Sequence, residues 1–264
     1  MPEPASSFPV AVASATIVML RQGADAPHLL MVKRRAGDAF GESYAFPGGL
    51  VDANESDSCE FSVGRIADEV NQLLGVFDAP RYYCAAIREL FEETGILLVR
   101  NDDVEIDADM LAALQDNRQQ VDRGELPWSA FLQQHNLRMA FDSLHYFAHW
   151  ETPLILPKRW STRFFLARLP EHQHASLDSN ELTEIRWMSA GEIVSAAKEG
   201  SMKLPFPTLR ILNGISRLTS VDEIIGWADK LAERPIDKIR PVRIAIDGKK
   251  RWVIKGEPGY IADK

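Results

Sequence analysis

The stretch that decides the fold reads RYYCAAIRELFEETGI and covers residues 81–96. It has the periodicity of a helix, and Glu92 and Glu93 lie three and four residues after Glu89. Residues at these spacings share one face of a helix, where like charges repel each other. A divalent cation would offset the repulsion, because Mg2+ binds carboxylate oxygens. The stretch therefore predicts a helix with an acidic, metal-binding face.

We expect this helix to be packed on one side and ion-paired on the other. It should begin at Pro80, a favourable first-turn residue, and end at Thr94, because Gly95 is a C-terminal stop. Arg88 precedes Glu92 by four residues and can pair with it. A solvated helix face is the usual explanation of a charge run. Here a solvated face is disfavoured, because the opposite face is apolar and should pack against the core. It consists of Ala85, Ile87, Leu90 and Phe91.

The composition, with 45% hydrophobic and 26% charged residues, is typical of a globular protein. The length allows one domain or two, and the absence of a repeat or a long linker favours one domain over residues 1–264. The formal net charge of −8 argues against a nucleic-acid partner, which needs clustered Lys and Arg. No apolar run is long enough for a membrane span, and the N-terminus lacks the basic region of a signal peptide. Cys59 and Cys84 have neither metal nor redox spacing, so we expect a reducing, cytoplasmic location.

Strand-like and helix-like stretches both occur, without an internal repeat or a long linker, so the pattern favours an α+β fold. The expected strands cover 9–22, 28–35, 43–46, 143–153, 161–169 and 183–190, with a final hairpin over 241–256 that turns at Asp247–Gly248. The expected helices cover 60–75, 80–94, one or two segments within 105–137, then 189–200 capped by Ser189, 207–218 and 220–233. We interpret 56–79 and 101–140 as helical insertions and 205–260 as C-terminal additions.

Two separated groups of residues resemble the signature of the Nudix hydrolase superfamily, G-x5-E-x7-R-E-U-x-E-E-x-G-U, in which U is aliphatic. Gly49 and Glu55 match its first half. The second half is matched by Arg88, Glu89, Leu90, Glu92, Glu93, Gly95 and Ile96. Residues 56–87 number 32 where the signature has seven, so the box is split by 25 extra residues. The resemblance implies an α/β/α sandwich with a mixed β-sheet, and leaves open whether Glu55 still abuts the helix.

The resemblance also implies hydrolysis of a nucleoside diphosphate linked to another moiety, by attack of water on one phosphorus. The ligands that it implies for Mg2+ or Mn2+ are Glu89, Glu92, Glu93 and the carbonyl of Gly48 or Gly49. Glu89 is open as ligand or as catalytic base, and Arg88 is expected to orient a glutamate. A further acid often comes from the loop before a late strand. We prefer Glu181 to Glu184 for this role, because Glu184 lies inside the expected strand 183–190.

Longer stretches are similar to the peroxisomal coenzyme A diphosphatases and their bacterial relatives. They cover residues 33–52, 149–169, 180–193 and parts of 239–260. This similarity implies coenzyme A or an acyl-coenzyme A as the favoured substrate, cleaved to 3′,5′-ADP and (acyl-)phosphopantetheine. The final ADK differs from the peroxisomal S-K-L signal, which favours a bacterial cytoplasm.

Coenzyme A carries a 3′-phosphate, so its site needs a cation in addition to those that meet the pyrophosphate. The candidates are Lys33, Arg34 and Arg35 before the glycine loop, and Lys158, Arg159 and Arg163 in the later region. If 159–167 is a strand, Arg159 and Arg163 share one face and could form a basic wall of the site. A solvated edge strand is the alternative.

Two other functions stay open at this point. The same chemistry could act on ADP-ribose, a nucleotide sugar or NADH. A non-catalytic Nudix-like domain that senses a nucleotide is the alternative from another class, although the complete set of glutamates counts against it. We expect a small-molecule nucleotide as the partner, and neither nucleic acid nor membrane. The helical insertions could shape the substrate pocket or the interface of a homodimer.

Overall fold

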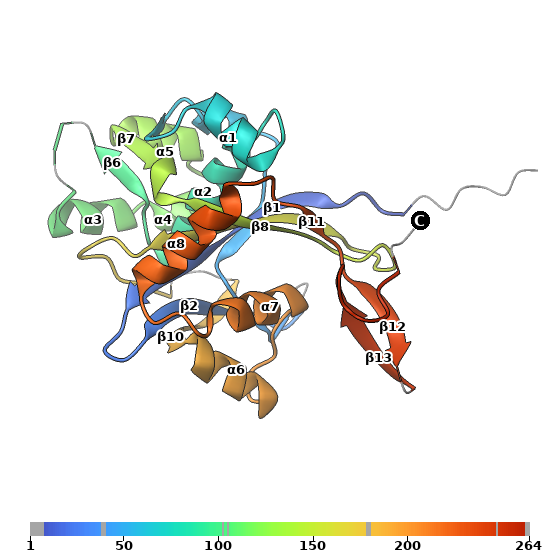
Figure 1. Cartoon of the computed structure of the whole chain (residues 1–264). Helices are drawn as coiled ribbons and strands as arrows, with labels where there is room; N and C mark the ends of the chain where they lie inside the picture. The colour runs from blue at the N-terminus through green and yellow to red at the C-terminus, as the bar shows by residue number, and fades with distance from the viewer. Residues whose placement is uncertain are drawn as a thin grey trace, which may run out of the picture.

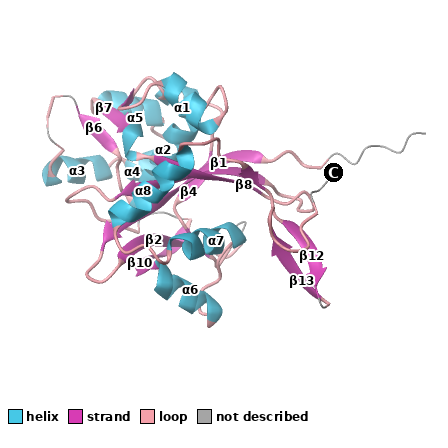
Figure 2. Ribbon diagram, viewed as in Figure 1, coloured by secondary structure: helices cyan, strands magenta, loops and turns pink. Residues whose placement is uncertain are grey.

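The computed structural model describes residues 8–37, 41–101, 103–104, 106–177, 181–246 and 248–261. It confirms an α+β fold, in which helices lie on both faces of a mixed sheet (Figures 1 and 2). Among the residues so described, no helix combines the length and the apolar character that crossing a membrane requires.

The main sheet has the strand order β10-β2-β1-β9-β8-β11. Its strands are β1 (Val12–Gln22), β2 (Pro27–Arg34), β8 (His145–Glu151), β9 (Trp160–Arg168), β10 (Leu182–Ser189) and β11 (Lys238–Ile239). Strands β1 and β2 form an antiparallel hairpin, and β1 runs parallel to β9. Two short strands, β3 (Tyr44–Ala45) and β4 (Gly48–Leu50), add to β2 and β1 respectively.

Alternate residues of β1 enter two separate hydrophobic clusters, because successive side chains of a strand point to opposite faces. Ile17 and Met19 pack against α2 (Pro80–Thr94) and the insertions. Val18 and Leu20 pack on the other side, against the C-terminal helices. These are α6 (Ala190–Lys198), α7 (Phe206–Ile215) and α8 (Val221–Ala232). The sheet is therefore a central layer between two layers of helices.

The insertions carry more irregular structure than the sequence predicts. The first contains η1 (Glu55–Ser58), β5 (Ser62–Val63) and α1 (Ala67–Leu74). The expected helix 60–75 thus begins only at Ala67, because Ser62 and Val63 pair with a distant strand. In the described part of the second insertion there are three helices rather than one or two: α3 (Ala108–Gln115), α4 (Arg118–Asp122) and α5 (Trp128–Gln134). Around them lie β6 (Val99–Asn101), β7 (Leu137–Ala140) and η2 (Phe141–Ser143).

The predicted C-terminal hairpin is present and stands apart from the main sheet. Its strands are β12 (Val242–Ile246) and β13 (Lys249–Val253), which pair with each other and project from the body of the molecule (Figure 1). Of the predicted turn Asp247–Gly248, Asp247 lies outside the described residues.

Candidate active site

The glutamate helix has the limits that the sequence predicts. It spans Pro80–Thr94, and Gly95 follows it with φ 74°, in the left-handed region that favours glycine. The apolar face is buried in the core, as predicted; it comprises Ala85, Ile87, Leu90 and Phe91. Because one face is fixed by packing, the charged face of α2 is held in one orientation.

Arg88 holds the two halves of the split signature together. Its guanidinium lies 2.8 Å from Glu92 and 3.1 Å from Glu89 on its own helix. It also lies 3.0 Å from the carboxylate of Glu55 and donates a hydrogen bond to the carbonyl of Leu50. Glu55, whose position the sequence leaves open, is only 3% exposed and abuts the helix. The 25 extra residues therefore loop out and leave the signature intact in space.

The two cysteines are in contact where η1 packs against α2. The sulfur of Cys59, which follows η1, lies 3.3 Å from the sulfur of Cys84 on α2, and both thiols are free. Their spacing of 25 in the sequence gives no sign of this contact.

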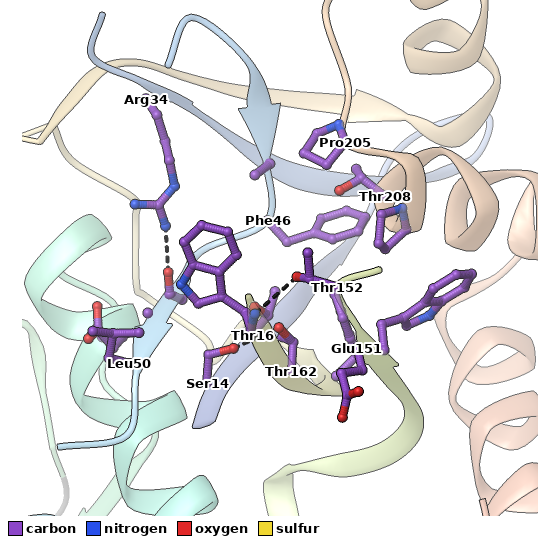
Figure 3. Close-up of a pocket in the computed structure, with 18 of the residues that line it drawn as sticks. Ser14, Thr16, Arg34, Phe46, Leu50, Glu151, Thr152, Thr162, Pro205 and Thr208 are labelled. Carbon is purple, nitrogen blue, oxygen red and sulfur yellow. Dashed lines mark hydrogen bonds between the residues drawn. The ribbon is translucent and has the colours of Figure 1, made fainter. Parts of the chain in front are cut away.

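Glu93 joins the helix to the glycine strand β4. The backbone N–H of Gly48 donates to its carboxylate at 2.8 Å, and Arg34 lies 3.1 Å from the other oxygen. Arg34 also donates to the carbonyl of Gly48 at 2.5 Å (Figure 3). A Cβ at Gly49 would overlap with the carboxyl group of Glu89. A side chain at position 49 would therefore displace the carboxyl group of Glu89, because β4 passes close to it.

Burial raises the pKa of all three glutamates, although Arg34 or Arg88 lowers each of them in part. The pKa is about 7 for Glu89, about 9 for Glu92 and about 8 for Glu93. Desolvation and mutual repulsion both disfavour the ionised forms, so the two arginines are too few to neutralise the cluster.

This donor set fits a hard divalent cation, which prefers carboxylate and carbonyl oxygens. Within the described part of the chain, no three Asp, Glu, His or Cys side chains converge into a ready-made metal site. The reason is that Arg88 holds Glu89 and Glu92, while Arg34 holds Glu93. A metal ion would compete with these arginines for the carboxylates. Glu89, Glu92, Glu93 and the carbonyl of Gly48 therefore remain the predicted ligands.

The glutamates line one end of a cavity of about 640 Å³, a size suited to a small-molecule ligand. Figure 3 shows Arg34 and Leu50 on the side of the cavity next to α2, and Pro205 and Thr208 on the side of α7. Much of the remaining lining is aromatic, and these rings belong to Phe46, Trp150, Trp160, Phe164, Phe206 and Trp252. The cavity thus combines carboxylates with aromatic surfaces suited to a planar or apolar group.

Glu181 reaches this cavity, whereas Glu184 is used elsewhere. Glu181 precedes β10, lines the cavity and lies 3.9 Å from Arg34, with its side chain 64% exposed. Glu184 lies inside β10, accepts a hydrogen bond from the hydroxyl of Tyr44 and pairs with Arg186. The placement agrees with the preference for Glu181, and its role remains a prediction.

Neither arginine predicted for this region lines the cavity: Arg163 lies within β9, and Arg159 immediately precedes it. The cavity is lined by Trp160, Thr162 and Phe164, so the residues between them point away. Arg159 is buried 2.7 Å from Glu151, and Arg163 donates to the hydroxyl of Tyr146 at 2.8 Å. The two faces of β9 are as the sequence predicts, but the cavity lies against the apolar one.

Of the other predicted cations, Arg34 lines the cavity, whereas Lys33, Arg35 and Lys158 lie outside its lining. Arg35 is exposed after β2, and the ammonium group of Lys33 lies over the ring of Tyr44. Lys158 is exposed before β9. The six aromatic residues that line the cavity were not predicted as site residues, and they come from five separate segments. No local pattern marks them, because the fold alone brings these segments together.

Comparison with known proteins gives consistent matches. A sequence model described as the NUDT19 Nudix domain matches residues 76–215. The acyl-coenzyme A diphosphatase NUDT19 of Xenopus laevis is 24% identical over 233 residues, which is 74% of this chain and 61% of that protein. The predicted nudix hydrolase 7 of Caenorhabditis elegans is 26% identical over 197 residues, which is 74% of this chain and 57% of that protein. This chain thus spans about three fifths of the length of these curated relatives.

Among solved structures, a Nudix hydrolase from Alicyclobacillus acidocaldarius superposes with a TM-score of 0.69 at 24% identity. The match covers 83% of this chain and 97% of that chain. At this identity the likeness bears on the fold.

Proposed function

Because this chain belongs to the Nudix hydrolase family, through its match to the NUDT19 Nudix domain, we propose that it is a metal-dependent pyrophosphohydrolase. Its substrate is a nucleoside diphosphate linked to another moiety, and the favoured substrate is coenzyme A or an acyl-coenzyme A. The observation that carries the proposal is the face of α2, where Glu89, Glu92 and Glu93 line a cavity beside the glycine strand β4.

The acidic end of the cavity supports the chemistry of pyrophosphate cleavage. Glu89, Glu92 and Glu93 would hold Mg2+ or Mn2+, which when bound neutralises charge on the pyrophosphate and polarises it. Arg34 lies between Glu93 and the carbonyl of Gly48, with its side chain partly exposed to the cavity. It can donate to a phosphate oxygen from there. Arg88 is buried and orients Glu89 and Glu92 rather than binding substrate.

Two carboxylates are candidates for the base that takes a proton from water. A base works best when its pKa lies near the working pH, and the pKa of Glu89 is about 7. Glu181 lies at the rim of the same cavity and is mostly exposed, so water can reach it. Proton abstraction by Glu89 would require it to be free of metal, which makes Glu181 the base if Glu89 is a ligand.

The aromatic lining of the cavity supports a substrate with a large organic moiety. Phe46, Trp160 and Phe206 offer ring surfaces for a base or an apolar chain. A relative that is 24% identical carries the name acyl-coenzyme A diphosphatase, which favours coenzyme A derivatives over other nucleoside diphosphates.

A substrate panel tests the proposal. Coenzyme A, an acyl-coenzyme A, dephospho-coenzyme A, ADP-ribose, a nucleotide sugar and NADH are incubated with the protein and Mg2+ or Mn2+, and products are separated by chromatography. We expect 3′,5′-ADP and phosphopantetheine from coenzyme A, with kcat/KM several-fold above that for dephospho-coenzyme A. Faster cleavage of ADP-ribose, a nucleotide sugar or NADH would keep the pyrophosphohydrolase and remove the coenzyme A assignment. No hydrolysis of any compound would favour a nucleotide-sensing domain.

A further inference from the structure

The C-terminal hairpin reaches the rim of the cavity. Pro241, immediately before β12, and Trp252 of β13 both line it. The rest of the hairpin projects from the body of the molecule (Figure 1). The face of the hairpin that carries Trp252 is therefore the face that a bound substrate meets.

Two cations share that face. Arg243 lies directly opposite Trp252 in the register of the hairpin, and Lys250 lies opposite Ala245. Directly opposite residues of an antiparallel pair lie on one face, and every second residue of a strand returns to it. Arg243, Trp252 and Lys250 thus share a face, while Arg251 points to the other. The guanidinium carbon of Arg243 lies 5.7 Å from the centre of the Trp252 ring, within cation–π distance.

These cations differ from those deeper in the cavity. Among its described lining residues, the cationic side chains are Arg34 and Arg88, and both are paired with glutamates. Arg243 and Lys250 are exposed, and neither forms an ion pair with another described residue. An anionic group of a ligand that extends from the cavity to the hairpin would therefore meet Arg243 and Lys250, which form no ion pair with other described residues.

We propose that Arg243 and Lys250 are specificity-determining residues that bind a phosphate carried by the substrate outside its pyrophosphate. The chemistry fits the 3′-phosphate of a nucleoside 3′,5′-bisphosphate moiety, with the ring of Trp252 beside the nucleoside. The inference rests on the proposed function, because it extends the same site. A charge-assisted hydrogen bond of this kind is worth about ten- to a hundredfold in affinity.

Equilibrium binding of two product-like nucleotides tests the proposal without turnover. Calorimetry compares 3′,5′-ADP with 5′-AMP, which lacks only the additional phosphate, for the whole chain. The wild type should bind 3′,5′-ADP about tenfold more tightly or better. Arg243→Ala and Lys250→Ala should each reduce this preference, and the double variant should abolish it, while affinity for 5′-AMP stays unchanged. Arg251→Ala is the matched control on the other face and should keep the preference.

Three results would overturn the proposal: equal affinities of the wild type for both nucleotides, a preference that survives in the double variant, or an equal loss with Arg251→Ala. Coenzyme A hydrolysis, measured separately, distinguishes this failure from failure of the proposed function. A protein that discriminates through Arg243 but hydrolyses nothing retains the hairpin assignment and loses the enzymatic one. A protein that hydrolyses coenzyme A but binds both nucleotides equally well retains the enzymatic assignment and loses the hairpin one.

Discussion

The carboxylate of Glu55 lies 3.0 Å from the guanidinium of Arg88, although 32 residues separate the two in the chain. Both side chains are buried, and the same guanidinium also binds Glu89 and Glu92. This pair therefore ties the segment before the insertion to the helix that carries the proposed metal ligands.

Replacing Glu55 with alanine should destabilise the protein markedly, because it leaves a buried guanidinium without one of its partners. Removing one member of a buried pair costs about 3–5 kcal/mol, and the remaining partners of Arg88 place this change at the lower end. Urea unfolding measures the effect. The matched control is Asp52→Ala, which removes a 53% exposed carboxylate 3.4 Å from the same guanidinium. It should cost less than about 1 kcal/mol. Equal losses for both variants would contradict the role of Glu55.

The metal-free protein should lose stability as the pH rises from about 5 to about 9. Burial raises the folded-state pKa of Glu89, Glu92 and Glu93 from the ordinary 4.5 to about 7, 9 and 8. The folded state therefore binds protons more tightly than the unfolded state. The stabilisation that results is fully present below the unfolded-state pKa of 4.5 and is lost as the pH rises through the folded-state values. Each such carboxyl contributes a slope of up to about 1.4 kcal/mol per pH unit.

Unfolding by urea at several pH values, in the presence of a chelator, measures this slope. Glu92→Gln should make it shallower, because that side chain no longer ionises. Saturating Mn2+ should also flatten it, since a bound cation favours the ionised carboxylates. A stability that rises with pH over this range would contradict the account.

Glu181→Gln should lower kcat/KM by about tenfold or more if Glu181 acts as the base. The matched control is Glu184→Gln, three residues later, whose carboxylate binds Tyr44 and Arg186 outside the cavity lining. It should leave kcat/KM within about twofold of the wild type. Unchanged kcat/KM in both variants would leave Glu89 as the base.

Arg163→Met should leave the preference for coenzyme A over dephospho-coenzyme A unchanged. Arg163 is 6% exposed, lies between the rings of Tyr82 and Tyr146, and faces away from the cavity. No ion pair of this guanidinium occurs among the described residues, so an apolar replacement should cost little stability or even add some. Loss of the preference in this variant would place Arg163 at the substrate after all. Arg34→Met, which alters a cavity residue, should reduce turnover instead.

The limits and faces of α2 could be predicted because they depend on local signals. The spacing of Arg88 and Glu92, the apolar face and the stop at Gly95 all lie within one short segment. Strand alternation likewise predicts that Trp160, Thr162 and Phe164 share one face of β9 and that Arg163 lies on the other.

What could not be predicted depends on contacts between distant segments. Glu55 contacts Arg88 although a 25-residue insertion lies between them in the chain. No local sequence pattern predicts this contact. The choice of which β9 face meets the cavity depends on Tyr146 and Tyr82, which cover Arg163. The late start of α1 has a similar cause, since Ser62 pairs with Met139 far along the chain.

The central claim is that the glutamate face of α2 supports metal-dependent pyrophosphate hydrolysis. Its most direct test is the rate of coenzyme A hydrolysis by chelator-treated protein as Mg2+ or Mn2+ is added back, in the wild type and in Glu93→Gln. We predict no turnover without metal and a saturable rise with it. In Glu93→Gln, kcat should fall by about a hundredfold or more, while Tm stays within a few degrees because Gly48 can still donate to the amide oxygen. Turnover in the presence of chelator, or near-wild-type kcat of Glu93→Gln at saturating Mg2+, would contradict the account.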